Sequence, residues 1–509
     1  MSAVAAPELE AGRAASSGVL AAACVSTFVV NANTSAVTIL LPTMSEDVGA
    51  PVAQLQWAVT GYMLVGAAVI VTSGALGDVF GRRRVFLGGL ALFIASCVFI
   101  ALSTSGAGII IGRLIQGAAG ATILACGMSL LSVGSSGKGQ MRAITLWGAA
   151  SAAGAAVGPL LGGALVELSG WQSLFWLDAG IAAACIPLTL AKVQESSDPK
   201  RARSIDYAGT VLIAVALVPL VLGFSEGGDW GWTSAATLGC FVASAVGAVL
   251  FVLVEKRVSA PIVDLALLRN QVLVGATLAI LIVAGTLNGL MYILSLYFQD
   301  PETFGMSPLE TGVATLPAAA GLIAVTPLIT PLAARIGTRL AIVAGFALGA
   351  AGFGALALVE SSWTYATFIL PLLVLAGGLG LANGPASSAS TASAVVSQDQ
   401  VGQASGISNM ARYIGGSVVV AAVATIFNTA TVEESAAGSA ASDALAAGVS
   451  RAALLMAILA GLGIAIALLM GRHQLARPRA VELAAAATGA LSHTIPTQPT
   501  TISNARSDG

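Results

Sequence analysis

Long apolar runs recur along the chain from Gly18 to Gly471, separated by short polar breaks. Most are about 20 residues long, the length at which a helix crosses the hydrocarbon core of a bilayer. Only 9% of the 509 residues are charged and 57% are hydrophobic, so the chain cannot build a water-soluble surface. The alternating segments of about ten residues that form membrane β-barrels are absent from the sequence. The pattern therefore predicts an all-α membrane protein.

Fourteen spans are predicted, beginning near residues 18, 54, 84, 107, 142, 172, 206, 233, 272, 309, 339, 364, 404 and 449. An even number of spans places both ends of the chain on the same side of the membrane. Of the 22 Lys and Arg residues, all but Arg113, Arg412 and Arg451 fall in the tails or in alternate connections. Connections rich in Lys and Arg stay in the cytoplasm. We therefore expect a multi-pass protein of the cell membrane with both termini cytoplasmic.

An internal repeat indicates how the spans are grouped. The segment Gly74 to Gly89, GALGDVFGRRRVFLGG, aligns without gaps on Thr330 to Gly345, TPLAARIGTRLAIVAG. One copy follows span 2 and the other follows span 10. The repeat therefore predicts two related six-helix bundles with two helices inserted between them, an arrangement typical of secondary transporters. The predicted segments are an N-terminal tail (1–17), a first bundle (18–192), a linker (193–205), two inserted helices (206–254), a linker (255–271), a second bundle (272–471) and a disordered tail (472–509).

The first copy of the repeat concentrates charge in a chain that has little. Glycines permit a tight reversal between antiparallel helices, and an arginine cluster holds such a turn in the cytoplasm. Asp78 can pair with a neighbouring arginine or face the positive N-terminus of an adjacent helix. The turn is thus either a topology signal alone or also a latch between helices. Its candidate residues are Gly74, Gly77, Asp78, Gly81, Arg82, Arg83 and Arg84, and in the second copy Ala334 and Thr338 replace Asp78 and Arg82.

These motifs resemble those of a known family. GALGDVFGRRRV resembles the signature loop of the major facilitator superfamily, and GRLIQGAAGA, Gly112 to Ala121, resembles its fourth-span motif. GAAVGPLLGG, Gly154 to Gly163, resembles the fifth-span motif of antiporters. LQWAVTGYML, IDYAG and GMSPLETGVATLP resemble segments of the fourteen-span drug/proton antiporters. The resemblance implies the major facilitator fold with a 6+2+6 arrangement of helices, and export rather than import.

The fifth-span motif also has a direct physical interpretation. Gly154, Gly158 and Gly162 recur every four residues and form a ridge without side chains, against which another helix can pack closely. Pro159 removes one backbone hydrogen bond and is expected to kink the span. Gly163 completes the motif. The alternative is ordinary packing between transmembrane helices.

A buried charge pair is the candidate for proton coupling. Arg113 lies within span 4, where an uncompensated charge is costly, so it should find a partner or line an aqueous cavity. The alternative is that its side chain snorkels to the outer interface. Gln116, one turn further, can share its hydrogen bonding. The resemblance places an aspartate where this chain has Asn33, which cannot titrate, whereas span 6 has Asp178 where the family commonly has asparagine. We hypothesise that Asp178 supplies the missing titrating group and acts with Arg113; the alternative is a packing acid away from any cavity.

Polar residues at helical spacing are candidates for lining a substrate cavity or, alternatively, for packing between helices: Asn31, Asn33, Thr34, Thr38, Gln116, Asn288 and Tyr292. The acids Glu226, Asp229, Glu302 and Glu310 are expected to be solvated at the outer rim, and Asp206 to cap the N-terminus of span 7.

Several functional classes are disfavoured. The segment GSSGKGQ lacks the spacing of an ATP-binding loop, and no metal-ligand pattern or catalytic constellation occurs in the sequence. We therefore expect no enzyme activity, cofactor, metal or nucleic-acid partner, and a monomer in the lipid bilayer. The favoured function is proton-driven export of small hydrophobic or amphipathic compounds by alternating access. The alternatives are export of one endogenous metabolite, and a scaffold or lipid-handling protein of the same fold.

Overall fold

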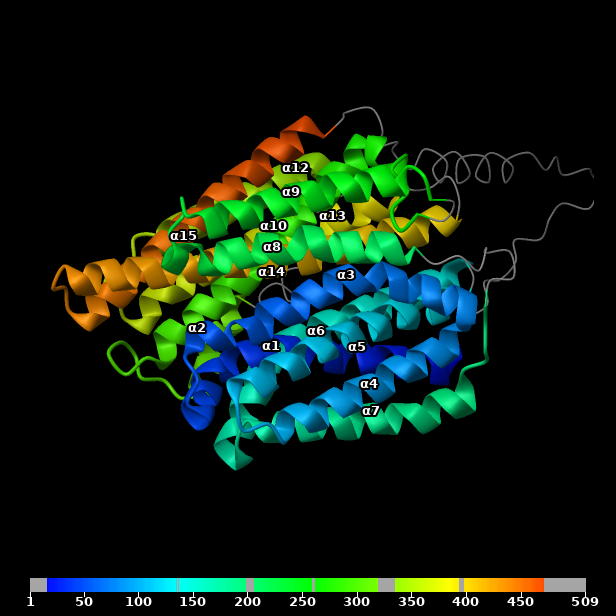
Figure 1. Ribbon diagram of the computed structural model, residues 1–509, viewed down its shortest axis with the longest axis horizontal. Coiled ribbons are helices and arrows are strands. Elements are labelled where there is room, and N and C mark those ends of the chain that lie inside the picture. Colours follow the sequence, from blue (N-terminus) through cyan, green and yellow to red (C-terminus); the bar gives the residue numbers. More distant parts are fainter. Residues whose placement is uncertain are drawn as a thin grey trace, which may run out of the picture. The chain divides into compact units, whose positions relative to one another are not determined.

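The computed structural model describes residues 16–133, 135, 137–197, 206–258, 261–318, 335–392 and 398–470. The chain divides into two units, Met1–Met470, which holds every described helix, and Gly471–Gly509. Within the described ranges the regular structure is helical, without strands. The helices, labelled in Figure 1, are α1 (Ser17–Val48), α2 (Val52–Leu55), α3 (Trp57–Phe80), α4 (Arg82–Ala101), α5 (Gly106–Val133), α6 (Gly137–Ser169), α7 (Gln172–Lys192), α8 (Tyr207–Trp230), α9 (Ala235–Glu255), η1 (Leu267–Arg269), α10 (Gln271–Gln299), α12 (Thr338–Leu356), α13 (Tyr365–Ala392), α14 (Gln398–Ala436) and α15 (Ala441–Leu469).

Thirteen of these helices are long and apolar enough to cross a membrane, so the predicted all-α membrane fold is confirmed. The span predicted near residue 309 is described as helix over 308–318, and residues 319–334 lie outside the described residues. The count of fourteen therefore stays a prediction, as do the predicted segment boundaries and the tail 472–509. Three helices begin before the apolar runs that predicted them near 142, 404 and 449: α6, α14 and α15. Hydropathy marks only the part of a helix that is in lipid, whereas backbone hydrogen bonding continues a helix through polar residues beyond it.

The two halves of the chain repeat the same helix contacts. In the first half α1 packs on α6, and α4 packs on α5 and α7. In the second half α10 packs on α14, and α12 packs on α13 and α15. These are equivalent pairs, as expected if the two halves are related, while the count of six helices in each half stays a prediction. The halves meet where α3 packs on α14 and where α1 packs on α10.

The helices α8 and α9 form a pair outside the two sets (Figure 1). α8 packs on α9, on α3 of the first half and on α14 of the second. α8 begins at a cap, as predicted, because Asp206 Oδ1 accepts a hydrogen bond of 2.7 Å from the Gly209 amide. Only 17% of the apolar window of α9 is buried in protein, so most of its surface is available to lipid.

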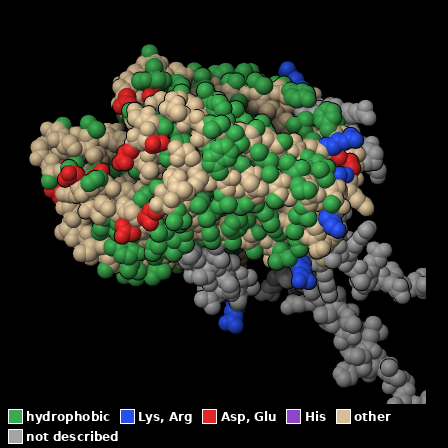
Figure 2. Space-filling view, turned by 90° about the horizontal axis from the view of Figure 1, so that it is seen from below, with side chains coloured by type: hydrophobic (Ala, Val, Ile, Leu, Met, Phe, Trp, Pro, Cys, Tyr) green, Lys and Arg blue, Asp and Glu red, His purple; other side chains and the backbone are tan. Residues whose placement is uncertain are grey.

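Charged side chains mark the two ends of the helices. Figure 2 shows Lys and Arg gathered toward one end and most of the visible Asp and Glu toward the other, with apolar side chains between. We call the end that holds the α3–α4 turn, with Arg82–Arg84, the basic end, and the end that holds Glu46 and Asp47 the acidic end. Arg451 lies toward the acidic end, where it pairs with Glu433 and Glu434.

Candidate functional site

Four polar side chains from three helices of the first half meet inside the protein. Asn33 comes from α1, Arg113 and Gln116 from α5, and Asp178 from α7. The exposed fraction of each is 1% or less. We call these four residues the buried polar cluster. Relative to the family pattern, Asn33 stands where an aspartate is usual and Asp178 where an asparagine is common. The two side chains, 145 residues apart in the sequence, are in contact in the structure.

Asn33 connects the acid to the base. Its Nδ2 donates to Asp178 Oδ2 at 2.7 Å, and its Oδ1 accepts from Arg113 Nη1 at 2.6 Å. A guanidinium only donates and a carboxylate only accepts, so the amide can satisfy both partners in one orientation alone. Asp178 and Arg113 make no direct ion pair among the described residues, and Asn33 occupies the place between them.

The remaining contacts of Arg113 hold it within the bundle. Its Nε donates to the Ala58 carbonyl at 3.0 Å, and its Nη1 also donates to Gln116 Oε1. The guanidinium carbon lies 4.2 Å from the centre of the Tyr62 ring, a cation–π contact. Nη2 is buried without a hydrogen-bond partner. Arg113 is therefore accommodated by internal partners in this structure rather than by snorkelling.

The electrostatic balance of the cluster depends on the protonation state of Asp178. A charge in the hydrocarbon region is costly unless it is paired and hydrogen-bonded. When Asp178 is ionised, the charges of Asp178 and Arg113 cancel within the cluster. When Asp178 is protonated, Arg113 loses that compensation. The arrangement can thus convert the gain or loss of one proton into a change in the stability of the helix packing around α1, α5 and α7.

An aromatic contact joins the cluster to the second half. The Tyr62 ring, which covers Arg113, lies 6.4 Å from the ring of Tyr413 on α14, measured between ring centres. Gly66 on α3 provides the space for Tyr413, because a Cβ at Gly66 would lie 2.6 Å from a ring carbon of Tyr413. A displacement of Arg113 would therefore be transmitted through Tyr62 to the contact between α3 and α14.

The charged turn between α3 and α4 is held within the first half. Asp78 pairs with Arg82, with 2.8 Å between Oδ1 and Nη2. Gly81 has a φ of 104°, a conformation that favours glycine, and it is both the last cap of α3 and the first cap of α4. Gly77 packs against Cys126, whereas nothing lies within 4 Å of a Cβ built at Gly74.

Glu195, which no sequence motif singled out, completes this turn. Its carboxylate accepts hydrogen bonds from the amides of Arg83 at 3.0 Å and Arg84 at 3.3 Å, at the N-terminus of α4. A carboxylate there is stabilised by the helix dipole and by otherwise unpaired amides. Glu195, rather than Asp78, therefore faces the positive N-terminus of the adjacent helix, α4. The sequence feature that could have indicated Glu195 is the presence of an acid in a connection rich in Lys and Arg.

The glycine ridge of α6 packs against α1, as its spacing indicated. A Cβ at Gly154 would collide with the carbonyl oxygen of Phe28, one at Gly158 with that of Ala32, and one at Gly162 would lie 2.9 Å from Ala36 Cβ. The neighbouring Gly163 and Pro159 face the other half. A Cβ at Gly163 would lie 2.6 Å from Leu309 Cα, and one at Gly312 would lie 2.7 Å from the Pro159 carbonyl oxygen.

Hydrogen bonds join the two halves toward the acidic end. Ser295 Oγ of α10 donates to the Thr38 carbonyl of α1, and Gln299 Nε2 donates to the Ile39 carbonyl, each at 3.0 Å. Ser307 Oγ also donates to Glu167 Oε1 at 2.5 Å. The halves are thus in direct contact toward their acidic ends.

The candidate cavity residues do not form one group. Asn33 and Gln116 belong to the buried polar cluster. Asn31, Thr34 and Asn288 donate to carbonyls four residues earlier in their own helices: Thr27, Val30 and Ala284. Tyr292 is buried, and its hydroxyl has no hydrogen-bond partner. Thr38 is buried at the contact with Ser295. Their role in binding substrate stays a prediction.

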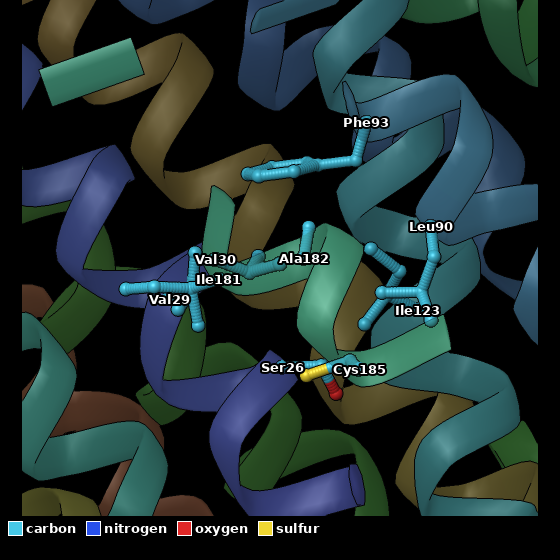
Figure 3. Close-up of a pocket in the computed structure, with 9 residues that line it drawn as sticks. All are labelled: Ser26, Val29, Val30, Leu90, Phe93, Ile123, Ile181, Ala182 and Cys185. Carbon is cyan, nitrogen blue, oxygen red and sulfur yellow. The ribbon is translucent and has the colours of Figure 1, made fainter. Parts of the chain in front are cut away.

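Figure 3 shows a pocket inside the first half, lined by apolar side chains of α1, α4, α5 and α7 together with Ser26 and Cys185. Its empty volume is about 180 Å³, and essentially none of it admits a water molecule. Ser26 Oγ is satisfied by the Ala22 carbonyl at 2.7 Å. This pocket is a gap in the packing rather than a substrate site.

The fold and the paired halves define a membrane protein of a secondary-transporter type. Solved structures of a peptide transporter of the POT family (TM-score 0.64, 14% identity, 89% of this chain and 95% of that one) and of a bacterial homologue of the lysosomal transporter Spinster (TM-score 0.60, 16% identity, 90% and 97%) have the same fold. The sequence model of the Major Facilitator Superfamily matches residues 23–420 of this chain. The chain belongs to that superfamily, as its motifs indicated.

Curated relatives are about one third identical to this chain over the regions that align. The multidrug resistance protein Stp of Mycobacterium tuberculosis is 33% identical over 80% of this chain and 75% of its own length. The tetracenomycin C resistance and export protein of Streptomyces glaucescens is 31% identical over 80% and 75%. The cephamycin export protein CmcT of Amycolatopsis lactamdurans is 31% identical over 81% and 85%.

Proposed function

We propose that this protein exports small hydrophobic or amphipathic compounds across the cell membrane by alternating access, and that protons drive it through Asp178. The names of the relatives support drug efflux, since they describe multidrug resistance and antibiotic export. The acidic and basic ends support an orientation with both termini in the cytoplasm. The protein acts as a monomer in the bilayer, because one chain already supplies both halves of the transport fold.

The mechanism follows from the charge balance of the buried polar cluster. With Asp178 ionised, the Asp178–Asn33–Arg113 chain is electrically neutral and the packing of α1, α5 and α7 is stable. A proton on Asp178 leaves Arg113 uncompensated, which favours a conformation in which the cluster is hydrated. The Tyr62–Tyr413 contact carries this change to the boundary between the halves. The bonds of α1 to α10 would then break as the acidic end opens.

The observation that carries this proposal is the hydrogen-bonded chain from Asp178 through Asn33 to Arg113. The test is proton release on addition of substrate, measured with a pH indicator on the purified protein in proteoliposomes. We expect Asp178→Asn to abolish proton release and to lower accumulation driven by a pH gradient by at least about tenfold, the effect of about 1.4 kcal/mol of coupling. The control is Glu360→Gln, an exposed acid toward the acidic end. Unchanged proton release by Asp178→Asn would refute the assignment.

A second candidate is export of one endogenous metabolite, favoured by the two relatives named for the export of a single antibiotic. The two candidates differ in substrate range. A panel of unrelated toxic compounds, tested on drug-sensitive cells that express the chain, separates them: multidrug efflux protects against several chemical classes, whereas a dedicated exporter protects against one.

A further inference from the structure

A second pocket lies toward the acidic end, between four helices that belong to three different parts of the chain. Its volume is about 470 Å³. Its walls come from α2 and the start of α3, from the last turns of α8 and from α14. Pockets for small organic molecules typically measure about 300 to 1,000 Å³. We call it the α8 pocket, because the inserted helix α8 supplies two of its three acids.

The lining of the α8 pocket is negative. Glu226, Asp229 and Glu433 line it, and none of its lining residues is Lys, Arg or His. Glu433 is paired with Arg451, so Glu226 and Asp229 remain to act on a ligand. They lie on the last turns of α8, where the helix dipole adds further negative potential. We expected both acids to be solvated, and Asp229 is exposed. Glu226, in contrast, is half-buried and accepts a hydrogen bond of 3.4 Å from Trp57 Nε1.

The α8 pocket also contains polar groups without partners. Gln56 is 5% exposed, and its Nε2 has no hydrogen-bond partner. Ser225 Oγ is likewise buried and unpartnered. Both residues line the pocket. A buried donor that is left unpaired costs free energy, and a ligand with a hydrogen-bond acceptor would recover it.

From this combination we infer that the α8 pocket binds amphipathic organic cations with an aromatic body. Glu226 and Asp229 attract the positive charge, and the indole of Trp57 offers apolar surface for the ring system. Gln56 and Ser225 bind the polar atoms of the ligand. The inserted helix α8 thereby acquires a role in ligand binding, which the two halves alone do not provide.

The position of the α8 pocket connects it to the buried polar cluster. Trp57 lines the pocket, and the next residue, Ala58, gives its carbonyl to Arg113 Nε. A ligand that shifts the start of α3 would therefore act on Arg113. This contribution to transport rests on the proposed function, whereas binding of a cation in the pocket does not.

The test is equilibrium binding to the full-length protein in nanodiscs, without a proton gradient. The probe is tetraphenylphosphonium, a monovalent aromatic cation, and the uncharged counterpart is triphenylphosphine oxide. We expect Glu226→Gln/Asp229→Asn to raise the Kd for the cation by at least about tenfold, with little change for the neutral compound. The matched control, Glu302→Gln, removes an acid from the same end of the protein outside the pocket and should leave both values unchanged.

A second variant tests the location rather than the charge. Asn428→Trp places a bulky ring in the pocket from α14 and should abolish binding of the cation with all acids intact. Three results would overturn the inference: no binding of tetraphenylphosphonium to the unmodified protein, an equal effect of the double variant on both compounds, or undisturbed binding in Asn428→Trp. Because no transport is measured, these outcomes are independent of proton release by Asp178→Asn.

Discussion

The turn at Gly81 and its repeat at Gly337 have the same backbone conformation, and each has an arginine at the equivalent position. Both glycines have positive φ, 104° and 88°, and both cap the helix that follows, α4 or α12. In each copy the arginine two residues later binds the end of the last helix of its own half. Arg83 Nη2 donates to the Leu190 carbonyl of α7 at 2.8 Å, and Arg339 Nε donates to the Ala467 carbonyl of α15 at 3.2 Å.

The two copies differ in every other charge. The first adds the Asp78–Arg82 pair and the Glu195 carboxylate on the amides of α4. At the position of Arg82 the second copy has Thr338, and Ala334, the counterpart of Asp78, lies outside the described residues. The shared arginine therefore serves a structural need of both halves, namely the unpaired carbonyls at a helix C-terminus. The additional charges of the first copy are not needed for this structural role, because the second copy fulfils it without them.

The same division recurs deep in the helices. Arg113 in the first half is joined through Asn33 to a carboxylate, whereas Arg412 in the second half donates to Asn383 Oδ1 at 3.1 Å and Ser387 Oγ at 2.8 Å, both neutral. Each half holds an arginine among its helices, and among the described residues only the arginine of the first half is linked to an acid. This difference supports our proposal that the coupling of transport to protons depends on the first half.

The largest expected difference is between the two arginines. Arg113→Met leaves Asp178 buried without its cation and should lower the free energy of unfolding by about 3 kcal/mol. Arg412→Met removes hydrogen bonds to neutral partners only and should cost about 1 kcal/mol. Denaturant unfolding in detergent measures both. In the double variant Arg113→Met/Asp178→Asn part of the loss should be recovered, and equal losses for the two single arginine variants would contradict the division.

Close helix packing should be equally important in both halves. A Cβ at Gly154 of α6 would collide with the Phe28 carbonyl of α1, and one at Gly415 of α14 with the Leu281 carbonyl of α10. We expect Gly154→Ala and Gly415→Ala each to destabilise the protein by about 1 to 3 kcal/mol through overpacking.

Gly377→Ala and Gly461→Ala are the matched controls, because nothing lies within 4 Å of a Cβ at either position. Both should be neutral or slightly stabilising, since alanine favours a helix over glycine. Thermal unfolding of the four variants tests the comparison, and a small effect at one of the two packed glycines would show that the halves are not packed alike.

The smallest effect is expected at the two turns. Arg83→Ala and Arg339→Ala should each cost about 1 kcal/mol, the contribution of a charged group to a helix C-terminus. Asp78→Asn should have a smaller effect on stability, because the asparagine Oδ1 can still accept a hydrogen bond from Arg82. It should nevertheless slow transport if the extra charges of the first turn act as a latch. If Asp78→Asn transports at the rate of the unmodified protein, the first turn is not a latch and acts as a topology signal alone.

The sequence by itself determined the class of fold, the placement of most spans, the repeat and the family, because each depends on local properties. A run of apolar residues forms a membrane helix wherever it occurs, and glycine spacing indicates a close-packed helix face without reference to the partner. The N-cap at Asp206 and the ridge at Gly154, Gly158 and Gly162 were predictable for the same reason.

Only the tertiary structure decided which side chains meet. Glu195 contacts the start of α4, and Asn33 lies between Asp178 and Arg113. Glu226 lines a pocket, whereas the sequence predicted that it would be solvated at the rim. The helical period tells which residues share one face of a helix, but the partner of that face depends on how several helices pack together. Contacts between residues far apart in the sequence are set by that packing, and the buried polar cluster and the α8 pocket depend on such contacts.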